Sequence, residues 1–537
     1  MTTPLSQSKI PLKPFYTPAE VIDLDYAAAI ADPGAFPYTR GRRGDPVGSG
    51  TWIQRELSGE GSPSRSNAQF RYLIEKGAVG LDVIGDAPTV ALLDPDHPFA
   101  RHAVGTQGVS LCRAQDYVEL YDGIPLERIT LSHSLPAAFA VAGLSLVAKT
   151  RGIAPAVLRG SVIQAPLYCE DYGYATHMPV NLRVRLALDS IEFCTAAMPK
   201  FHSFVEDTYY ISDGGPNAVE EMALGFVEIR HLVRALRQRG LAIDRFAPRI
   251  AILVNCRMDL FEEVAKIRAT RRLFARMMRD EFGARDPRSW SVNITAHTAG
   301  SSLTAQQPIN NVVRGTVQAL ALALAGVQAM EISAFDEAYR TPSPEAHLVG
   351  LRTQQVVQLE SKVAAVADPL GGSYYVESLT NEIERRIWEL VVHIEGLGDP
   401  ATLCDQGWFR RLFEEAMQRE ARGVQDGTVP RVGVNVFQVS VERDTLLKAI
   451  SETKIEPCGE QIERVREFKR TRDLAQLVPA MRQVFAHAKT ATNLLPAMIA
   501  AMEAGATTGE IAGALRVAYG AAYDPFGATQ PEFPLAA

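Results

Sequence analysis

The feature that most constrains the fold of this chain is an alternation of short β-branched runs with helical stretches. From about residue 75 onward, each short apolar run is followed by a segment whose apolar residues recur at helical spacing. Parallel strands need long crossover connections of this kind, so the alternation predicts a parallel sheet covered by helices. Eight candidate strands within about 300 residues favour a closed (β/α)8 TIM barrel. They are residues 78–84, 128–134, 158–164, 201–206, 248–255, 290–295, 329–334 and 363–367.

The chain divides into three predicted parts. Residues 1–60 are rich in Pro, Gly and Arg and lack periodicity, which predicts an extended N-terminal arm. Residues 61–400 carry the predicted substrate-binding barrel. Residues 401–537 lack further strand signals and predict a helical C-terminal extension, with helices over 405–422 and 459–520.

Two barrel helices have recognisable ends. Asn217 followed by Glu220 has the pattern of a capping box, and it predicts a helix over 218–239 that stops at Gly240. A second helix is predicted to begin at Asn381, because apolar residues recur on one face from there to Gly396.

Composition excludes several classes of function. A 537-residue chain with 47% hydrophobic and 22% charged residues is typical of a globular domain, and its net charge of -7 argues against nucleic-acid binding. The sequence has neither an apolar run of membrane-spanning length nor the apolar core of a signal peptide. Its six cysteines form no C-x-x-C pair. We therefore expect reduced thiols in a cytoplasmic protein without a membrane partner.

The active site of a TIM barrel lies at the C-terminal ends of its strands. The residues that follow the predicted strands are rich in tyrosine, amide and hydroxyl groups, and the sequence lacks metal-ligand spacing, a P-loop and a G-x-S-x-G motif. Such a set favours chemistry supplied by a cofactor. It comprises Gln164, Tyr168, Glu170, Tyr172, Tyr174, Tyr209, Tyr210, Asp213, Asn255, Arg257, His297, Ser301, Ser333 and Glu337.

Several motifs together resemble the methylmalonyl-CoA mutase family, and they occur in the order typical of that family. The most specific in combination are Phe-Asp-Glu-Ala at 335–338 and Ala-Asp-Pro-Leu-Gly-Gly-Ser-Tyr-Tyr-Val-Glu at 367–377. The others are Phe-Pro-Tyr-Thr-Arg-Gly at 36–41, Tyr-Asp-Gly-Ile-Pro-Leu at 121–126, Phe-Ala-Pro-Arg at 246–249 and Thr-Ala-Gly-Ser-Ser-Leu-Thr at 298–304 with Asn310 and Asn311.

The resemblance implies an adenosylcobalamin-dependent mutase whose acyl-CoA substrate threads the barrel. Family members bind cobalamin through an Asp-x-His-x-x-Gly motif, which this sequence does not contain. The chain is therefore similar to the large subunit of the two-subunit members, such as isobutyryl-CoA and 2-hydroxyisobutyryl-CoA mutases. A separate small subunit would supply the cobalt ligand, in a heterotetramer built on a dimer of large subunits. Whether a GTPase chaperone services the cofactor stays open.

The resemblance also assigns roles to individual residues. Gln164 matches the family's substrate-contacting Gln, and Arg249 and Gln328 match residues that contact CoA. Tyr209 and Glu337 match residues that contact the adenosyl group. Asp213 stands where the family has Glu, and Ser333 where it has Asn; both are expected beside the cofactor. Ser301 is a further candidate for substrate binding.

Departures from the family pattern bear on the substrate. Leu57 replaces a Tyr that wedges against the substrate. Tyr174 replaces the Arg that clamps a substrate carboxylate, and a carboxylate buried there without a partner would be costly. Tyr210 replaces the catalytic His, and tyrosine can still donate a hydrogen bond to a carbonyl. His297, where the family has Gln, could restore an imidazole.

A second group of changes concerns the carrier of the acyl group. A family Arg near the CoA phosphates becomes Gly50, and Arg42 and Arg43 could take its place. We therefore expect radical 1,2-rearrangement of a branched acyl-CoA thioester without a free carboxylate. Two alternatives stay open: a substrate carried on something other than CoA, and a degenerate, non-catalytic subunit that binds CoA or a partner.

Each singled-out residue also has a structural alternative. Tyr209 and Tyr210 could be packing aromatics, His297 a satisfied structural histidine and Leu57 a core leucine. A run of arginines is expected to form a solvated helix face, as runs of charge usually do. This run comprises Arg268, Arg271, Arg272, Arg276 and Arg279.

Overall fold

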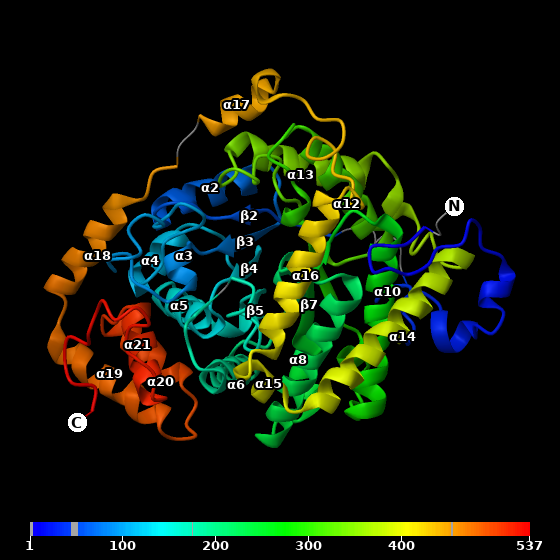
Figure 1. Ribbon diagram of the computed structural model, residues 1–537. Coiled ribbons are helices and arrows are strands. Elements are labelled where there is room, and N and C mark those ends of the chain that lie inside the picture. The colour runs from blue at the N-terminus through cyan, green and yellow to red at the C-terminus, as the bar shows by residue number, and fades with distance from the viewer. Residues whose placement is uncertain (1–3, 45–51, 174, 453–454, 537) are drawn as a thin grey trace. The chain divides into compact units, whose positions relative to one another are not determined.

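The computed structural model describes residues 4–44, 52–173, 175–452 and 455–536 of the chain (Figure 1). It has an α/β fold with a nine-stranded sheet in the order β1-β9-β8-β7-β6-β5-β4-β3-β2. The strand pairs whose registers are resolved are parallel. The predicted class, a parallel sheet with crossover helices, is therefore confirmed.

Two compact units divide the chain. The first comprises residues 1–56 and 206–453, and the second comprises residues 57–205 and 454–537. The boundary falls within strand β6 (Phe201–Asp207).

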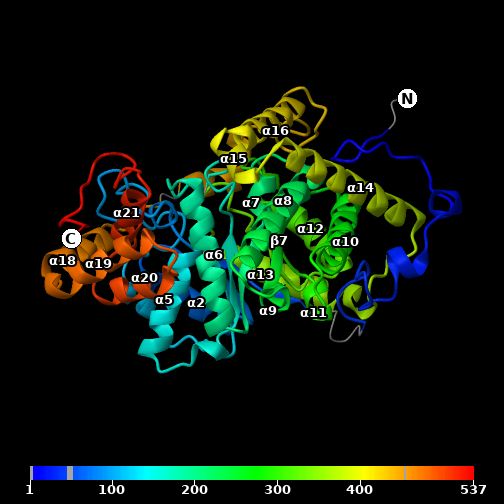
Figure 2. The same ribbon diagram turned by 90° about the horizontal axis from the view of Figure 1, so that it is seen from below.

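The first unit holds the strands β1, β7, β8 and β9. β7 and β8 pair from Ala251↔Asn293 to Cys256↔Thr298, and β8 and β9 pair from Thr295↔Ala329 to His297↔Glu331. Helices α8, α10 and α12 lie around β7 (Figures 1 and 2). The strands are β1 (Ile53–Gln54), β7 (Ile250–Cys256), β8 (Asn293–Thr298) and β9 (Ala329–Glu331). The helices are α7 (Thr208–Asp213), α8 (Ala218–Gln238), α9 (Ile243–Phe246), α10 (Leu260–Arg276), α11 (Pro287–Trp290), α12 (Asn310–Ala325), α13 (Pro344–Leu359), α14 (Tyr374–Leu397), α15 (Pro400–Asp405), α16 (Trp408–Gln425) and α17 (Thr445–Ser451).

The second unit combines a run of strands with the C-terminal helices. β3 and β4 pair from Gly80↔Thr130 to Ile84↔Ser134. The strands are β2 (Leu57–Ser58), β3 (Gly80–Ile84), β4 (Thr130–Ser134) and β5 (Gly160–Gln164). The helices are α2 (Pro63–Glu75), α3 (Ala87–Val90), α4 (Ala114–Leu120), α5 (Ala137–Thr150), α6 (Val180–Ala197), α18 (Gly459–Thr471), α19 (Leu474–Ala488), α20 (Leu495–Glu503) and α21 (Thr508–Ala518).

Most predicted elements are found, and the exceptions have local causes. Seven of the predicted strands correspond to β3–β9. The eighth, 363–367, is wrong: Lys362 adopts a left-handed backbone and Val363–Ala365 forms a 3-10 helix. Strands β1 and β2 are only two residues long, so no alternation reveals them.

The two predicted helix starts have different outcomes. The Asn217–Glu220 capping box is confirmed at the start of α8. The helix predicted from Asn381 begins earlier, at Tyr374, because the Ser373 hydroxyl accepts a hydrogen bond from the backbone of Val376.

The arginines of α10 are buried, so the predicted solvated face is wrong for most of them. Arg268 and Arg272 are at most 1% exposed, and they form ion pairs with Glu377 and Glu384 of α14. Arg271 is equally buried and donates to the carbonyl of Gly326 at 2.7 Å. Arg276 and Arg279 remain partly exposed. The carboxylates on α14 supply the compensation that a buried guanidinium requires.

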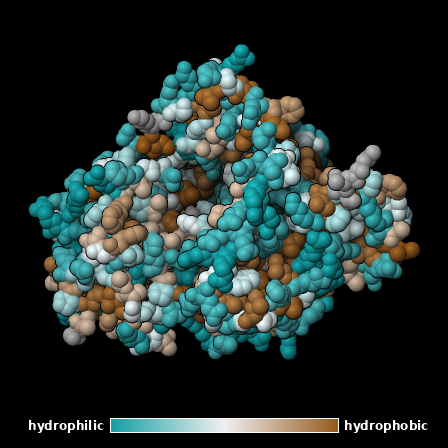
Figure 3. Space-filling model, in the orientation of Figure 1, coloured by the Kyte–Doolittle hydropathy of each residue, from teal (hydrophilic) through white to brown (hydrophobic). Residues whose placement is uncertain are grey.

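The surface in Figure 3 is mainly hydrophilic, with hydrophobic side chains scattered across the face in view. Among the described residues, no helix is both long and apolar enough to cross a membrane.

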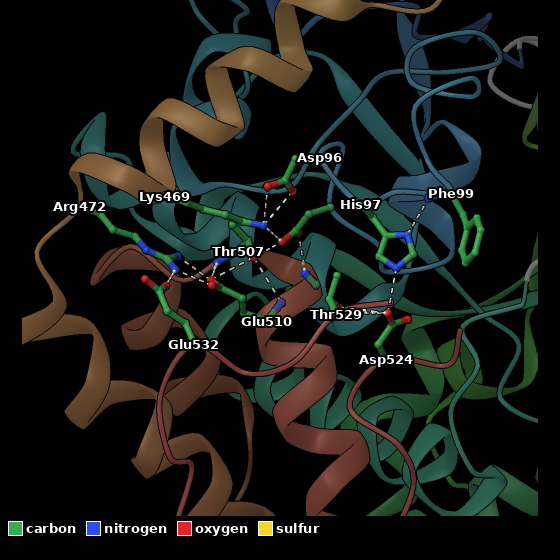
Figure 4. Close-up of polar contacts among 12 residues, drawn as sticks. Asp96, His97, Phe99, Lys469, Arg472, Thr507, Glu510, Asp524, Thr529 and Glu532 are labelled. Carbon is green, nitrogen blue, oxygen red and sulfur yellow. Dashed lines mark hydrogen bonds and ion pairs between the residues drawn. The ribbon is translucent and has the colours of Figure 1, made fainter. Parts of the chain in front are cut away.

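A polar network joins the C-terminal helices to the loop at 94–97 within the second unit (Figure 4). Lys469 lies 2.9 Å from Asp94 and 2.8 Å from Asp96. The hydroxyl of Thr507, the N-cap of α21, donates to Asp94 at 2.6 Å. His97 lies 3.0 Å from Asp524. These buried and partly buried contacts fix the C-terminal helices to the strand-bearing part of their unit.

The carboxylate of Asp524 organises the chain after α21. It accepts hydrogen bonds from the backbone N–H groups of Phe526, Ala528 and Thr529 at 2.7–3.0 Å. Burial opposes its ionisation, but these donors and His97 outweigh burial and lower its pKa to about 2. Its stabilising effect is therefore present above its ordinary pKa of 3.8 and is lost as the pH falls toward 2.

We expect Asp524→Asn to lower the free energy of unfolding by about 1–3 kcal/mol near neutral pH, because backbone donors lose a charged acceptor. The difference from the wild type should shrink as the pH falls through the acidic range. Urea unfolding followed by circular dichroism across that range measures both effects. Asp122→Asn, at an exposed aspartate of the same unit, is the control. An equal difference at every pH would contradict the role of the carboxylate charge.

Candidate functional site

In the first unit, most of the predicted site residues gather where strands end. Tyr209, Tyr210 and Asp213 lie on α7, directly after β6, and His297 lies near the end of β8. Ser301 belongs to the 3-10 turn that follows β8, and Glu337 lies in the turn after β9. The strand-end rule of parallel barrels therefore brings these side chains to one edge of the sheet.

Asp213 is the acceptor at the centre of this group. Its Oδ1 accepts hydrogen bonds from Asn255 Nδ2 at 2.8 Å and from the Ser301 hydroxyl at 2.7 Å. Asn255 Nδ2 also lies 3.3 Å from the backbone carbonyl of Tyr209. The side-chain amide of Asn255 therefore links the end of β7 to residues near both ends of α7. Asn255 was only one of many strand-end candidates, and nothing in its local sequence marks it as the connecting residue.

Tyr209 presents a neutral phenol. It is 6% exposed, and the backbone N–H of Gly300 donates to its hydroxyl at 3.3 Å. Burial, followed by the charges of Asp213 and Glu337, raises its pKa well above the ordinary value. Its ring centroid lies 4.8 Å from that of His297 and 5.1 Å from that of Tyr210. The three rings therefore form one cluster.

Glu337 has a pKa of about 7. Burial is the main cause, and the hydrogen bond from the backbone of Ala334 at 2.9 Å and the nearby His297 partly offset it. Both protonation states of this carboxyl are therefore accessible near neutral pH, as either donor or acceptor.

Gly300 leaves space where three oxygens converge. A Cβ placed on this residue would lie 3.1 Å from the Tyr209 hydroxyl, 3.6 Å from Asp213 Oδ2 and 3.8 Å from Glu337 Oε1. Such a Cβ would be tight against the Tyr209 hydroxyl and in ordinary van der Waals contact with the two carboxyl groups, so glycine keeps room beside the phenol.

His297 is paired with a glutamate that sequence reasoning missed. Its Nε2 lies 3.1 Å from Glu331 Oε2, and both residues are at most 5% exposed. Glu331 also acts on Glu56, another buried glutamate of this unit. Burial raises the pKa of Glu56 well above its usual range, and the charge of Glu331 raises it further. Glu331 is the last residue of β9, where the sequence reads as an ordinary strand with no turn or motif to single it out.

The buried ammonium group of Lys266 supports the residues that border the site. Lys266 of α10 is 0% exposed; its Nζ lies 2.8 Å from Glu221 and 2.6 Å from Glu263, and it donates to the backbone carbonyl of Asn255 at 2.7 Å. Glu221 in turn accepts from the backbone of Asn255 at 3.2 Å and from the Thr208 hydroxyl at 3.1 Å. The Lys266 triad (Lys266, Glu221 and Glu263) therefore holds the residues next to Tyr209 and Asp213.

The chain beyond α16 borders the same site. Arg431 donates to the backbone carbonyl of Ser301 at 2.7 Å. Glu420 lies 2.5 Å from Arg431 and 2.9 Å from Arg257, the residue that follows β7. These ion pairs fix the segment around 420–431 beside the turn that carries Ser301.

Other predicted residues of this unit lie elsewhere or serve the fold. Ser333 uses its hydroxyl to donate to the carbonyl of Thr298 at 2.8 Å. Gln328 precedes β9, accepts from the backbone of Ile294 at 2.8 Å and donates to Gly326 at 3.0 Å. Arg249 immediately precedes β7. Gln328 and Arg249 thus lie at the N-terminal ends of β9 and β7, whereas Glu337 and Asn255 lie at or beyond the C-terminal ends of the same strands. Arg43 is exposed.

The second unit holds Leu57 and Gln164. Leu57 lies in β2, paired with Asp82 of β3. Gln164 ends β5, and its side-chain amide donates to the Ser190 hydroxyl at 3.0 Å and to the Ser203 carbonyl at 2.8 Å. A mainly apolar cavity of about 80 Å³ adjoins Gln164, between the starts of α5 and α6. Tyr174 lies outside the described residues, as does Gly50.

Comparison with known proteins gives a consistent result. The family model described as methylmalonyl-CoA mutase matches residues 5–521. The chain is 35% identical to the 2-hydroxyisobutanoyl-CoA mutase large subunit of Aquincola tertiaricarbonis, covering 95% of this chain and 91% of that protein. It is 34% identical to the methylmalonyl-CoA mutase of Escherichia coli, covering 95% and 71% of the two chains. Identity to the mitochondrial methylmalonyl-CoA mutase of Mus musculus is 32%, covering 95% and 68%.

We expect Lys266→Met to destabilise the protein by about 3–5 kcal/mol, since removing one partner of a buried ion pair leaves uncompensated charge. Adding Glu221→Gln to this variant should restore part of the loss, because fewer buried charges remain unpaired. Thermal and urea unfolding measure both changes. Lys448→Met, at an exposed lysine of the same unit, is the control. A Lys266→Met variant as stable as this control would show that the triad does not support the site.

Proposed function

Because the chain belongs to the methylmalonyl-CoA mutase family, we propose that it is the large, substrate-binding subunit of an adenosylcobalamin-dependent acyl-CoA mutase. Its relatives are named as mutases, and mutases are isomerases, so the chain is an isomerase. The observation that carries the proposal is the convergence of Tyr209, Asp213 and Glu337 on Gly300 at the strand ends. The printed name of the Aquincola relative supports a small-subunit partner, and we propose a dimer of large subunits with two small ones.

We propose, from membership of the family, that the parallel sheet belongs to a (β/α)8 barrel. β1 pairs with β9 and β2 pairs with β3, and only Arg55 and Glu56 separate the two short strands along the chain. A ligand threading such a barrel would have its carrier at the N-terminal strand ends, beside Arg249 and Gln328. Its reacting group would then lie at the C-terminal ends.

The donor set around Gly300 fits the adenosyl group of the cofactor. Ribose hydroxyls can donate hydrogen bonds to carboxyl groups and to a phenol oxygen, and the hydrogen bonds that carboxylates accept are strong. Asp213, Glu337, Tyr209 and Ser301 would hold this group. Bound at these residues, adenosylcobalamin would supply the radical chemistry of the rearrangement.

The chain's own residues would bind the thioester and exclude water. Tyr210 would donate a hydrogen bond to the thioester carbonyl in place of the family's His. His297, paired with Glu331, and Gln164 are the other proposed catalytic groups. Gln164 would contribute its side-chain carbonyl oxygen, because Ser190 and Ser203 take both hydrogens of its amide. The close packing of the aromatic rings limits access of water, which protects a reactive radical from side reactions.

The substrate we propose is a branched acyl-CoA without a free carboxylate. Position 174 carries Tyr instead of the family's carboxylate-binding Arg, and an unpaired carboxylate would be costly to bury. Leu57 and the apolar cavity beside Gln164 favour a hydrocarbon substituent. A non-catalytic role has less support, because a degenerate subunit would have no need to retain the oxygens that converge on Gly300.

We expect branched acyl-CoA thioesters to produce a radical EPR signal when mixed with this chain, its small subunit and adenosylcobalamin. Tyr210→Phe should lower kcat by about 10²–10³, with a smaller effect on KM, because the lost donor acts mainly in the transition state. Tyr374→Phe, at an exposed tyrosine, is the control.

The outcomes separate the alternatives. A silent acyl-CoA panel with cofactor bound would favour a different carrier. Failure to bind the cofactor, with the small subunit present, would favour the degenerate subunit. Rearrangement of methylmalonyl-CoA itself would contradict the proposed substrate class.

A further inference from the structure

The segment that follows α16 exposes apolar side chains to an unusual degree. Residues 432–441 read Val-Gly-Val-Asn-Val-Phe-Gln-Val-Ser-Val. Phe437 is 83% exposed and Val441 is 64% exposed, and Val432 and Val439 exceed 40%. Exposed apolar residues that occur singly need no explanation, whereas a contiguous group marks an interaction site. In Figure 1, this segment belongs to the chain that leads from α16 to α17, near the top of the view.

Hydrogen bonds hold this segment in a defined conformation. Asn435 Nδ2 donates to the carbonyls of Val424 at 2.8 Å and Val429 at 2.9 Å, and its Oδ1 accepts from the backbone of Arg431 at 2.6 Å. The backbone N–H of Gly433 donates to the carbonyl of Val436 at 2.8 Å. A preformed surface loses less conformational entropy on binding than a mobile one.

The backbone of Phe437 is constrained to display its ring. Its φ is +51°, a left-handed value that is unfavourable for a residue with a large side chain. Gln307 donates to its carbonyl at 3.0 Å, and Asp444 accepts from the backbone of Gln307. Such conformations persist where surrounding contacts determine them, and they occur often at binding surfaces.

The segment begins beside the candidate site. Arg431 immediately precedes it and donates to the carbonyl of Ser301, whose hydroxyl donates to Asp213. Arg314 donates to the carbonyl of Val432 at 2.9 Å and to the Thr304 hydroxyl at 2.8 Å. A protein seated on residues 432–441 would therefore lie next to the turn that carries Ser301.

We propose that residues 432–441 form the docking surface for the small, cofactor-carrying subunit, with Phe437 inserted into an apolar pocket of that subunit. This inference rests on the proposed function, which requires a second protein to bring its ligand to the Asp213 site. A surface beside that site serves this purpose. A large aromatic side chain at the centre of an apolar patch is the usual anchor of such an interface.

The test compares the affinity of the wild-type chain and its Phe437→Ser variant for the purified, adenosylcobalamin-loaded small subunit by isothermal titration calorimetry. We expect the Kd to rise by at least about tenfold, since an interface anchor is lost. Val439→Ser should have a smaller effect in the same direction. Val392→Ser, at a 56%-exposed valine on α14, is the control and should leave the Kd unchanged. Because Phe437 is exposed, the melting temperature of each variant should match the wild type.

Three outcomes would overturn the inference. Unchanged affinity of Phe437→Ser for a small subunit that binds the wild type would disprove the docking surface and leave the proposed function intact. A wild-type chain that does not bind the small subunit would remove the proposed function as well. Sedimentation of the chain alone that changes from dimer to monomer on Phe437→Ser would assign the surface to a second copy of this chain.

Discussion

The buried ammonium of Lys266 is the interaction on which the candidate site depends. Burial lowers the pKa of such a group, but Glu221 and Glu263 outweigh burial and raise it, so the lysine stays charged. Compensation of this charge requires α8, α10 and the end of β7 to adopt one arrangement, since each contributes a partner. The same groups hold the backbone of Asn255, whose side chain fixes Asp213, which in turn receives the Ser301 hydroxyl. The position of Asp213, the central acceptor of the site, therefore depends on an ion cluster that is linked to it through Asn255.

Charge compensation recurs throughout the helices of the first unit. Arg268 and Arg272 of α10 are paired with Glu377 and Glu384, which are two helical turns apart on one face of α14. Glu206, at the end of β6, is not compensated by an ion pair of this kind. Burial and the neighbouring Glu228 raise its pKa well above the usual range, so the two glutamates retain a proton. Ion pairing and proton retention both avoid isolated buried charge. Together they allow polar strand ends to lie beneath a layer of helices.

Sequence patterns predicted the parts of the structure that depend on local interactions. β-branched runs marked β3–β9, and the Asn217 capping box marked α8, because these signals lie within a few residues. Burial of Arg268 was not predictable, since its carboxylate partners Asp368 and Glu377 lie 100 and 109 residues away. The strand-end rule found Tyr209, Asp213, Ser301 and Glu337. It could not identify Lys266, which lies mid-helix, or distinguish Glu331 from an ordinary strand residue.

The electrostatics of the site favour neutral hydrogen-bonding groups. Burial keeps the Tyr209 phenol protonated, raises the pKa of Glu337 to about 7 and raises the pKa of Glu56 well above its usual range. A hydrolytic site needs a strong base and fixed hydrogen-bond donors for a developing oxyanion. Buried phenol and carboxyl groups with raised pKa values meet these needs poorly. A radical rearrangement of the kind we propose would develop little net charge, so it would need neither a strong base nor an oxyanion hole at this site. The same burial that makes these carboxyl groups weak acids thus makes the site suitable for holding an uncharged, reactive species away from water.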